Sequence, residues 1–261
     1  MYDRISGLST PPTQAVEPSQ SVDSDGFMET VADLALRRSP LPGDLPDMGC
    51  CASKPNVSDP NNPSTSGPVR PNDPLFDYRS VELADANVDG ICVGLTAEWL
   101  GNLQNSPRSR MTALTPGSDG HGSSAVWQQR YLDLRGDLRN EGAEPPQANS
   151  DAKYAMLQEA GLQPSHKEKV YSFDDPASIS SMLGKITADG SRYLLSLKFV
   201  EGGGHTVATS TLNGRTTLFD PNYGEFSVPS DQVDSLLQRL ADRYIDPNGL
   251  YLKSIATRKM S

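Results

Sequence analysis

Residues 205–220 read HTVATSTLNGRTTLFD, and this stretch indicates the fold class more strongly than any other. Two alternating runs flank the dipeptide Asn213-Gly214, a pattern typical of a β-hairpin with a two-residue turn. Such a turn fixes the strand pairing, because the residues on either side of it, Leu212 and Arg215, must lie opposite each other. The sequence therefore predicts two antiparallel strands that meet at this turn in a known register.

The register brings two polar side chains together. Counting back from the turn pairs Val207 with Asp220 and His205 with Asn222. Residues two apart on one strand share a face, so His205 and Asp220 become diagonal neighbours on one face of the sheet. A carboxylate there can accept a hydrogen bond from one imidazole nitrogen and orient the other for proton transfer. Taken singly, each has a simpler reading, His205 as a strand-end residue and Asp220 as a turn former.

The rest of the chain predicts an α+β domain. Asp89-Gly90 precedes a helix in which every fourth residue is apolar, namely Ile91, Leu95, Trp99 and Leu103. Further helices are predicted at 124–138, 151–159, 176–186 and 230–244, and strands at 169–173, 193–200, 205–212, 215–220, 225–228 and 250–256. Because helices come first and strands later, we expect segregated layers, with helices packed on a mostly antiparallel sheet. We assign Trp99 and Trp127 to the core and His121 and His166 to the surface.

The N-terminal third is too polar and too rich in proline to form a core. Of 21 prolines, 12 lie in the first 80 residues. We expect residues 1–48 to be a disordered extension with at most a short amphipathic helix at 27–36. Residues 49–74 are predicted to be a proline-rich linker, and residues 75–261 the folded domain.

Composition excludes several classes of protein. The net charge is −10, from 23 basic and 33 acidic residues, and Lys and Arg form no cluster that would neutralise phosphates, so we expect no nucleic-acid ligand. No apolar run approaches the ~18 residues that cross a bilayer, and the N-terminus lacks the order of a secretory signal. No cysteine spacing resembles a zinc site, and we expect no metal and no organic cofactor.

Cys92 is the one cysteine of the predicted folded domain. It lies in the first helical turn, where the positive end of the helix dipole lowers a thiol pKa and favours the thiolate. A thiolate beside an oriented imidazole suits nucleophilic catalysis. The first-turn amides, with Asn87 five residues upstream, are placed to stabilise an oxyanion. The alternative is that Cys92 is a small buried hydrophobic residue, as most lone cysteines are.

Three segments resemble the YopT/AvrPphB family of type III secreted cysteine proteases, and most of all its rhizobial branch, the NopT effectors. They are NVDGICVGL at 87–95, Gly204-His205, and LFDPNYG at 218–224. The resemblance covers residues 75–261 and implies a papain-like fold. It implies that Cys92 is the nucleophile, His205 the general base and then acid, Asp220 the orienting residue, and Asn87 with the Cys92 amide the oxyanion hole.

The segment Met48-Gly49-Cys50-Cys51 reads as an N-myristoylation signal inside the chain. Myristoylation needs a free glycine amine, so the signal requires a cut between Met48 and Gly49. One myristoyl chain binds membranes only marginally, so palmitoylation of Cys50 and Cys51 is the expected second anchor. Members of the family that this chain resembles cut themselves before such a glycine, usually after a lysine, whereas Asp47 and Met48 stand here.

The resemblance implies an autoprocessing type III effector. Host N-myristoyl and palmitoyl transferases would anchor it at the host plasma membrane, where it would cleave a host signalling protein such as a cytoplasmic kinase or a small GTPase. Two alternatives stay open. The same three residues would also serve an acyltransferase or transglutaminase, and a lipid-anchored adaptor would need no enzymatic activity.

Overall fold

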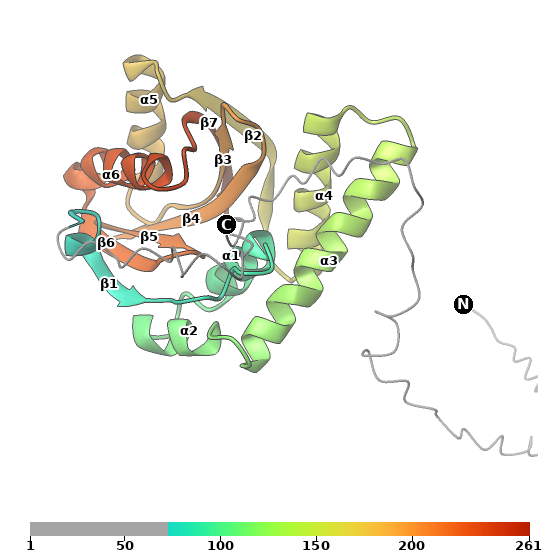
Figure 1. Cartoon of the computed structure of the whole chain (residues 1–261), viewed down its shortest axis with the longest axis horizontal. Coiled ribbons are helices and arrows are strands. Elements are labelled where there is room, and N and C mark those ends of the chain that lie inside the picture. The colour runs from blue at the N-terminus through green and yellow to red at the C-terminus, as the bar shows by residue number, and fades with distance from the viewer. Residues whose placement is uncertain (1–72) are drawn as a thin grey trace, which may run out of the picture. The chain divides into compact units, whose positions relative to one another are not determined.

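The computed structural model describes residues 73–261 (Figure 1). The expectations for the extension at 1–48, the helix at 27–36 and the signal around Gly49 therefore lie outside the described residues. Within the described part, no helix is long and apolar enough to cross a membrane.

The described residues form seven strands, six α-helices and two short 3-10 helices. The strands are β1 (Arg79–Glu82), β2 (Pro164–Ser172), β3 (Arg192–Phe199), β4 (Gly204–Leu212), β5 (Arg215–Asp220), β6 (Gly224–Pro229) and β7 (Leu252–Met260). The α-helices are α1 (Cys92–Gly101), α2 (Pro107–Ala113), α3 (Asp119–Asn140), α4 (Pro145–Glu159), α5 (Pro176–Ile186) and α6 (Val233–Ile245), and the 3-10 helices are η2 (Phe76–Tyr78) and η3 (Ser230–Gln232).

All seven strands belong to one sheet, in the order β1-β6-β5-β4-β3-β7-β2. Each neighbouring pair in it is antiparallel. The predicted hairpin register is confirmed, because Leu212 pairs with Arg215 and Ala208 pairs with Phe219. Both residues of the Asn213-Gly214 turn have positive φ, as this kind of turn requires. The α+β class and the antiparallel sheet are therefore confirmed.

Helices cover both faces of this sheet, which corrects the expectation of segregated layers. Helices α5 and α6 lie on one face, and α1, α3 and α4 on the other (Figure 1). The reason is visible in β3, where the neighbours Leu194 and Leu195 are both fully buried but belong to different apolar clusters. Successive side chains of a strand point to opposite faces, so an apolar run needs cover on both sides.

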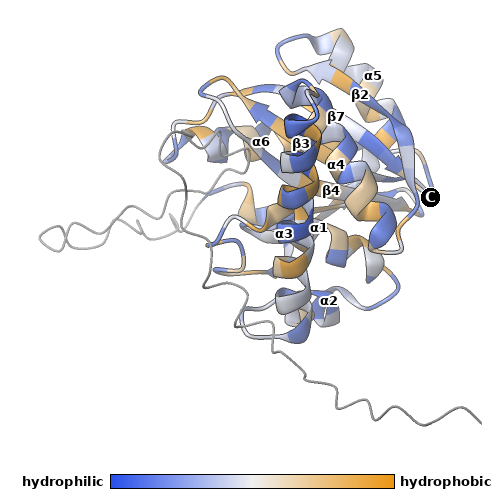
Figure 2. Cartoon of the chain, turned by 90° about the vertical axis from the view of Figure 1, so that its right-hand side faces the viewer, coloured by the Kyte–Doolittle hydropathy of each residue, from blue (hydrophilic) through white to orange (hydrophobic). Residues whose placement is uncertain are grey.

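The helices differ from the predictions in extent and burial. The helix predicted from Asp89-Gly90 begins at Cys92, and it is buried nearly all round rather than along one stripe. Helix α3 begins at Asp119, earlier than predicted, because the Ser118 side chain caps it. Helix α2 and strand β1 were not predicted at all. Figure 2 shows hydrophilic and hydrophobic residues mixed along the elements on the side that carries α3 and α4.

The aromatic and histidine assignments were right in part. Trp99 is fully buried and His166 is exposed, as predicted. Trp127 is only partly buried, and its indole N–H donates a hydrogen bond to the carboxylate of Glu98, 3.1 Å away. His121 is not a free surface residue but is partly buried in the first turn of α3.

Candidate active site

The predicted contact between His205 and Asp220 is present. Nε2 of His205 lies 2.9 Å from Oδ1 of Asp220, and both side chains are fully buried. His205 is the second residue of β4 and Asp220 the last residue of β5, so the pair lies where the start of β4 meets the end of β5, two strands in the interior of the sheet. The pair faces α6, where the ring centroid of Tyr244 lies 5.6 Å from that of the His205 imidazole.

Asp220 accepts hydrogen bonds from three directions. Its Oδ1 accepts from His205 and from the backbone N–H of Asn222, which lies 2.8 Å away. Its Oδ2 accepts from the hydroxyl of Tyr244, also at 2.8 Å. Burial, and then the negative charge of Asp220, raises the pKa of Tyr244 well above its ordinary value of 10, so the hydroxyl keeps its hydrogen.

These contacts determine which nitrogen of His205 can act as a base. An ionised carboxylate has only acceptor atoms, so Nε2 must carry the hydrogen that it shares with Asp220. In the neutral ring, Nδ1 then holds the lone pair. Nδ1 is buried and has no hydrogen-bond partner among the described residues. Because buried polar atoms are nearly always paired, an unpaired ring nitrogen at this place is consistent with a reactive group.

Helix α1 lies beside the start of β4, next to His205. The hydroxyl of Thr96 donates to the backbone oxygen of Thr206, next to His205, at 3.1 Å. One turn later, Trp99 stacks on Phe219 at a centroid distance of 5.3 Å, deeper in the sheet. Cys92 precedes Thr96 by one helical turn, about 6 Å along the helix axis.

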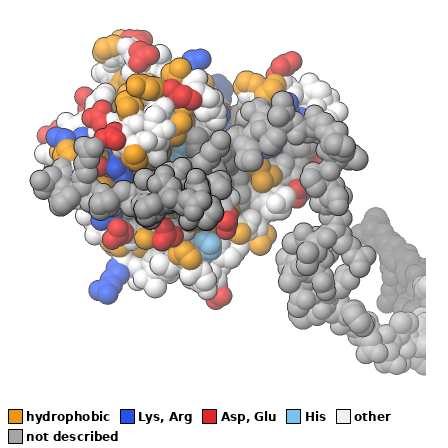
Figure 3. Space-filling model, in the orientation of Figure 1, with side chains coloured by type: hydrophobic (Ala, Val, Ile, Leu, Met, Phe, Trp, Pro, Cys, Tyr) orange, Lys and Arg blue, Asp and Glu red, His pale blue; other side chains and the backbone are white. Residues whose placement is uncertain are grey.

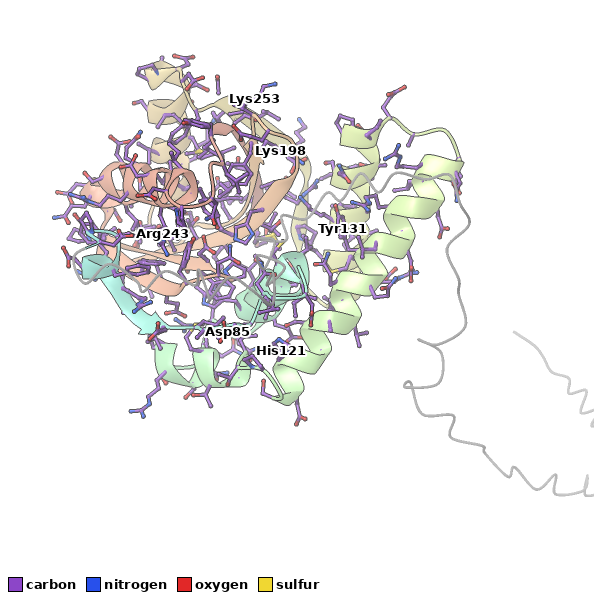
Figure 4. The ribbon with its side chains drawn as sticks, in the orientation of Figure 1. Asp85, His121, Tyr131, Lys198, Arg243 and Lys253 are labelled. Carbon is purple, nitrogen blue, oxygen red and sulfur yellow. The ribbon has the colours of Figure 1, made fainter. Side chains whose placement is uncertain are left out.

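The loop before α1 is also fixed near the end of β5. The side-chain nitrogen of Asn87 donates to Oδ1 of Asn222 at 2.7 Å, beside Asp220. A ring nitrogen of His121 lies 3.0 Å from the backbone oxygen of Ala86, and Figure 4 shows His121 next to the loop residue Asp85. The segment around Cys92 is therefore tied on one side by Asn87 to Asn222 and on the other by Thr96 to Thr206, two residues that are close in the chain to Asp220 and His205.

The first-turn amides of α1 are arranged differently from the prediction. No side chain of the N-cap residue caps this helix. Instead Oε1 of Gln128, from α3, accepts from the amides of Val93 and Gly94 at 3.0 and 3.4 Å. The two helices come this close because residue 94 is glycine, since a Cβ there would fall 1.8 Å from the backbone oxygen of Ser124. The amides of Val93 and Gly94 are therefore already paired, and of the first-turn amides expected to stabilise an oxyanion that of Cys92 is left as the candidate.

Sequence reasoning missed Gln128 and Tyr244, two buried residues that contact the site from α3 and α6. Neither carries a local signal, because each lies in an ordinary amphipathic stretch far along the chain from its partners. Within residues 73–261, no group of His, Cys, Asp or Glu side chains is arranged to hold a metal ion.

Comparison with known proteins adds independent evidence. Residues 70–260 match the peptidase family C58, described as Yersinia/Haemophilus virulence surface antigen. Proteins of Bradyrhizobium diazoefficiens and Sinorhizobium fredii that are named as YopT-like are each 56% identical to this chain, over 270 and 262 residues and the full length of both partners.

A more distant relative has a solved structure. The cysteine protease avirulence protein AvrPphB of Pseudomonas savastanoi pv. phaseolicola is 30% identical over 205 residues, covering 77% of this chain and 72% of that one. The crystal structure of AvrPphB superimposes with a TM-score of 0.66 and 25% identity, covering 72% of this chain and 99% of that one.

The fold and these matches define the class of the molecule, which is a cysteine protease. Within that class, the chain belongs to the YopT family, peptidase family C58, together with AvrPphB.

Proposed function

We propose that Cys92, His205 and Asp220 form the catalytic triad of this protease. The observation that carries the proposal is the buried hydrogen bond between His205 and Asp220, supported by the hydrogen bond from Thr96, one helical turn after Cys92, to Thr206 beside His205. Cys92 is the one cysteine within the described residues, so no other thiol there competes for the role.

The geometry supports a defined sequence of steps. Nδ1 of His205 takes the proton of the Cys92 thiol, and the thiolate attacks the substrate carbonyl carbon. The resulting oxyanion accepts hydrogen bonds from the Cys92 amide and from the side-chain nitrogen of Asn87. His205 then returns its proton to the leaving amine, and water releases the acyl group. Asp220 keeps the ring oriented and stabilises the imidazolium throughout.

We further propose that the protease processes itself and is then anchored to a membrane. The support is the sequence around residues 48–51, where cleavage after Met48 would free Gly49 for myristoylation and leave Cys50 and Cys51 for palmitoylation. With this processing and anchoring, the protease would be a type III secreted effector that acts at the host plasma membrane. Its substrate would be a host protein, with a cytoplasmic kinase or a lipidated small GTPase as the candidates.

Intact mass spectrometry of the purified full chain tests both proposals. We expect the wild type to lose residues 1–48 and the Cys92→Ala variant to stay full length. His205→Ala and Asp220→Ala should behave like Cys92→Ala, and His166→Ala, which changes an exposed histidine, should behave like the wild type. An intact wild-type chain that transfers acyl groups to amines would instead favour the transferase alternative.

Membrane fractionation after expression in a eukaryotic cell tests the anchor. Gly49→Ala should release the cleaved protein from membranes, because the remaining chain has no myristoyl acceptor, while its peptide hydrolysis stays unchanged. Unchanged fractionation of this variant would refute the anchor and leave the protease assignment standing.

A further inference from the structure

We infer that the charge of Asp220 sets the orientation of the Asn87 amide through a directed chain of hydrogen bonds, in which Tyr244 and Asn222 are positioning residues. The inference rests on the proposed function, because it concerns the proposed oxyanion donor. It joins the acid of the triad to a residue of the loop before α1.

The direction of the chain is set at Asp220. Its Oδ2 can only accept, so the single hydroxyl hydrogen of Tyr244 must point to it across 2.8 Å. The oxygen of Tyr244 is then free only to accept. It does so from the side-chain nitrogen of Asn222, which lies 3.2 Å away. Asn222 is held in place by its own backbone N–H, which donates to Oδ1 of Asp220 at 2.8 Å.

The same logic passes through Asn222 to the loop before α1. Since the amide nitrogen of Asn222 faces Tyr244, its oxygen faces Asn87. That oxygen needs a donor, and the side-chain nitrogen of Asn87 supplies it at 2.7 Å. If both amides were reversed, two acceptor oxygens, one of Asn222 and one of Asp220, would face the hydroxyl of Tyr244. Its single hydrogen can pair with only one of them, so two oxygens would be left in contact without a hydrogen between them. The reversed chain is therefore strongly disfavoured.

An unsatisfied atom supports this direction. Oδ1 of Asn87 is buried and has no hydrogen-bond partner among the described residues. A buried amide oxygen without a partner costs free energy, and no hydrogen bond of that oxygen holds it in this orientation. The hydrogen bond from the nitrogen of Asn87 to Asn222 is therefore what fixes the amide. It leaves the second N–H of that nitrogen for the proposed oxyanion.

The competing explanation is that Tyr244 only fills space. Its ring packs 5.2 Å from Phe199 and 6.0 Å from Tyr223, measured between ring centroids. Tyr244→Phe keeps these ring contacts and removes only the hydroxyl. Tyr223→Phe is the matched control, because it removes a hydroxyl from a neighbouring, partly buried ring whose hydrogen-bond partners are Arg243 and Asn248 rather than Asp220.

A double-mutant cycle tests the inference, with kcat and KM measured on a peptide that spans residues 42–55 of this chain. We expect Asn87→Ala to lower kcat roughly 100-fold, the usual loss for one oxyanion donor. Tyr244→Phe should lower kcat about 30-fold in the wild type but no more than about threefold in the Asn87→Ala background, since its main effect acts through Asn87. KM should change less than about twofold, and Tyr223→Phe should match the wild type in both backgrounds.

Each other outcome overturns the inference. A kcat for Tyr244→Phe within about twofold of the wild type shows that the hydroxyl positions nothing. Equal losses in both backgrounds show that Tyr244 acts without Asn87. If Tyr244→Phe does not fold, Asn222→Ala replaces it in the cycle, because it removes both links and keeps the backbone N–H. A wild type that leaves the peptide uncut refutes the proposed function itself and, with it, the inference.

Discussion

Gln128 shows how single residues build this site from a distance. It lies on α3, yet its side-chain oxygen accepts from the amides of Val93 and Gly94 in the first turn of α1. Helices usually obtain such a cap from a residue at their own N-terminus, but here that residue is Ile91, which has no acceptor. The position of the Cys92 backbone therefore depends on a residue that is 36 positions away along the chain.

Replacing Gln128 by Met should destabilise the fold and reduce activity. The substitution keeps the side-chain length but leaves two buried N–H groups without an acceptor, which costs about 1–3 kcal/mol of unfolding free energy for each unsatisfied group. Urea denaturation measures this loss. Gln129→Met is the control, because the exposed Gln129 donates its hydrogen bond to Asp133 in the same helix. Equal stability of the two variants would contradict the capping role.

The residues of the site were predictable where a local rule links them. The Asn213-Gly214 turn sets the register that places His205 beside Asp220, and a first-turn position marks Cys92. Tyr244 and Gln128 could not be predicted, since they reach the site through the packing of α6 and α3 on the sheet. That packing depends on the whole core, and no spacing in the sequence encodes it.

Among the elements, α1 and α2 are both held to β6 by one buried carboxylate, through a hydrogen bond from α1 and an ion pair with α2. The carboxylate of Glu225 on β6 accepts from the indole of Trp99 at 2.6 Å and from two nitrogens of Arg110 on α2, at 2.8 and 3.0 Å. Both charged side chains are almost fully buried. One carboxylate therefore fixes α1 and α2 to the same strand.

We expect Glu225→Gln to destabilise the fold by about 3–5 kcal/mol, because the substitution leaves the charge of Arg110 buried without its partner. Thermal and urea unfolding measure the change. Glu159→Gln is the matched control, since it breaks the pair with Arg130, in which both side chains are about 40% exposed, and it should leave the unfolding midpoint unchanged. Similar losses in the two variants would show that the burial of the Glu225 pair has no special role.

The elements that the sequence predicted are those with a strong period or a clear turn. The helix at 176–186 was predicted with its observed bounds, because Asp175 caps it and its apolar face is regular. Strand β1 and helix α2 were missed, since four residues of β1 and the polar sequence PRSRMTA of α2 carry too little pattern. Strand β1 forms through pairing with β6, where Gly224 lets the backbones approach closely.

At the scale of the whole molecule, the surface drawn in Figure 3 mixes the two signs of charge. Lys and Arg side chains of the described residues lie among Asp and Glu there and do not gather in one patch. This arrangement, with a net charge of −10 for the chain, gives no basic patch on the drawn surface that would attract a phosphate-rich ligand.

Buried tyrosines should make the whole fold sensitive to alkali. Burial and the charge of Asp220 raise the pKa of Tyr223 to about 12, and that of Tyr244 lies well above 10. In the unfolded chain both ionise near pH 10, so their contribution to stability is complete below pH 10 and is lost as the pH rises toward the folded-state values. Between the two pKa values, each group lowers the free energy of unfolding by about 1.4 kcal/mol for each unit that the pH rises.

Urea unfolding at pH 9, 10 and 11 measures this slope. Tyr223→Phe should reduce the slope between pH 10 and 11 by the amount of one titrating group, while Tyr251→Phe, at an exposed tyrosine, should not. A slope that Tyr223→Phe leaves unchanged would contradict the burial described for this ring.

The central claim is that Cys92 reacts as a thiolate paired with the imidazole that Asp220 orients. Its most direct test is the pH dependence of carboxamidomethylation at Cys92, followed by mass spectrometry of the peptide that contains it. In the wild type we expect the rate to persist from pH 8 down to about pH 6, because an imidazolium stabilises the thiolate there. In His205→Ala the rate should fall about tenfold per pH unit below about pH 8, as for an ordinary thiol. Identical profiles in the two proteins would contradict the account.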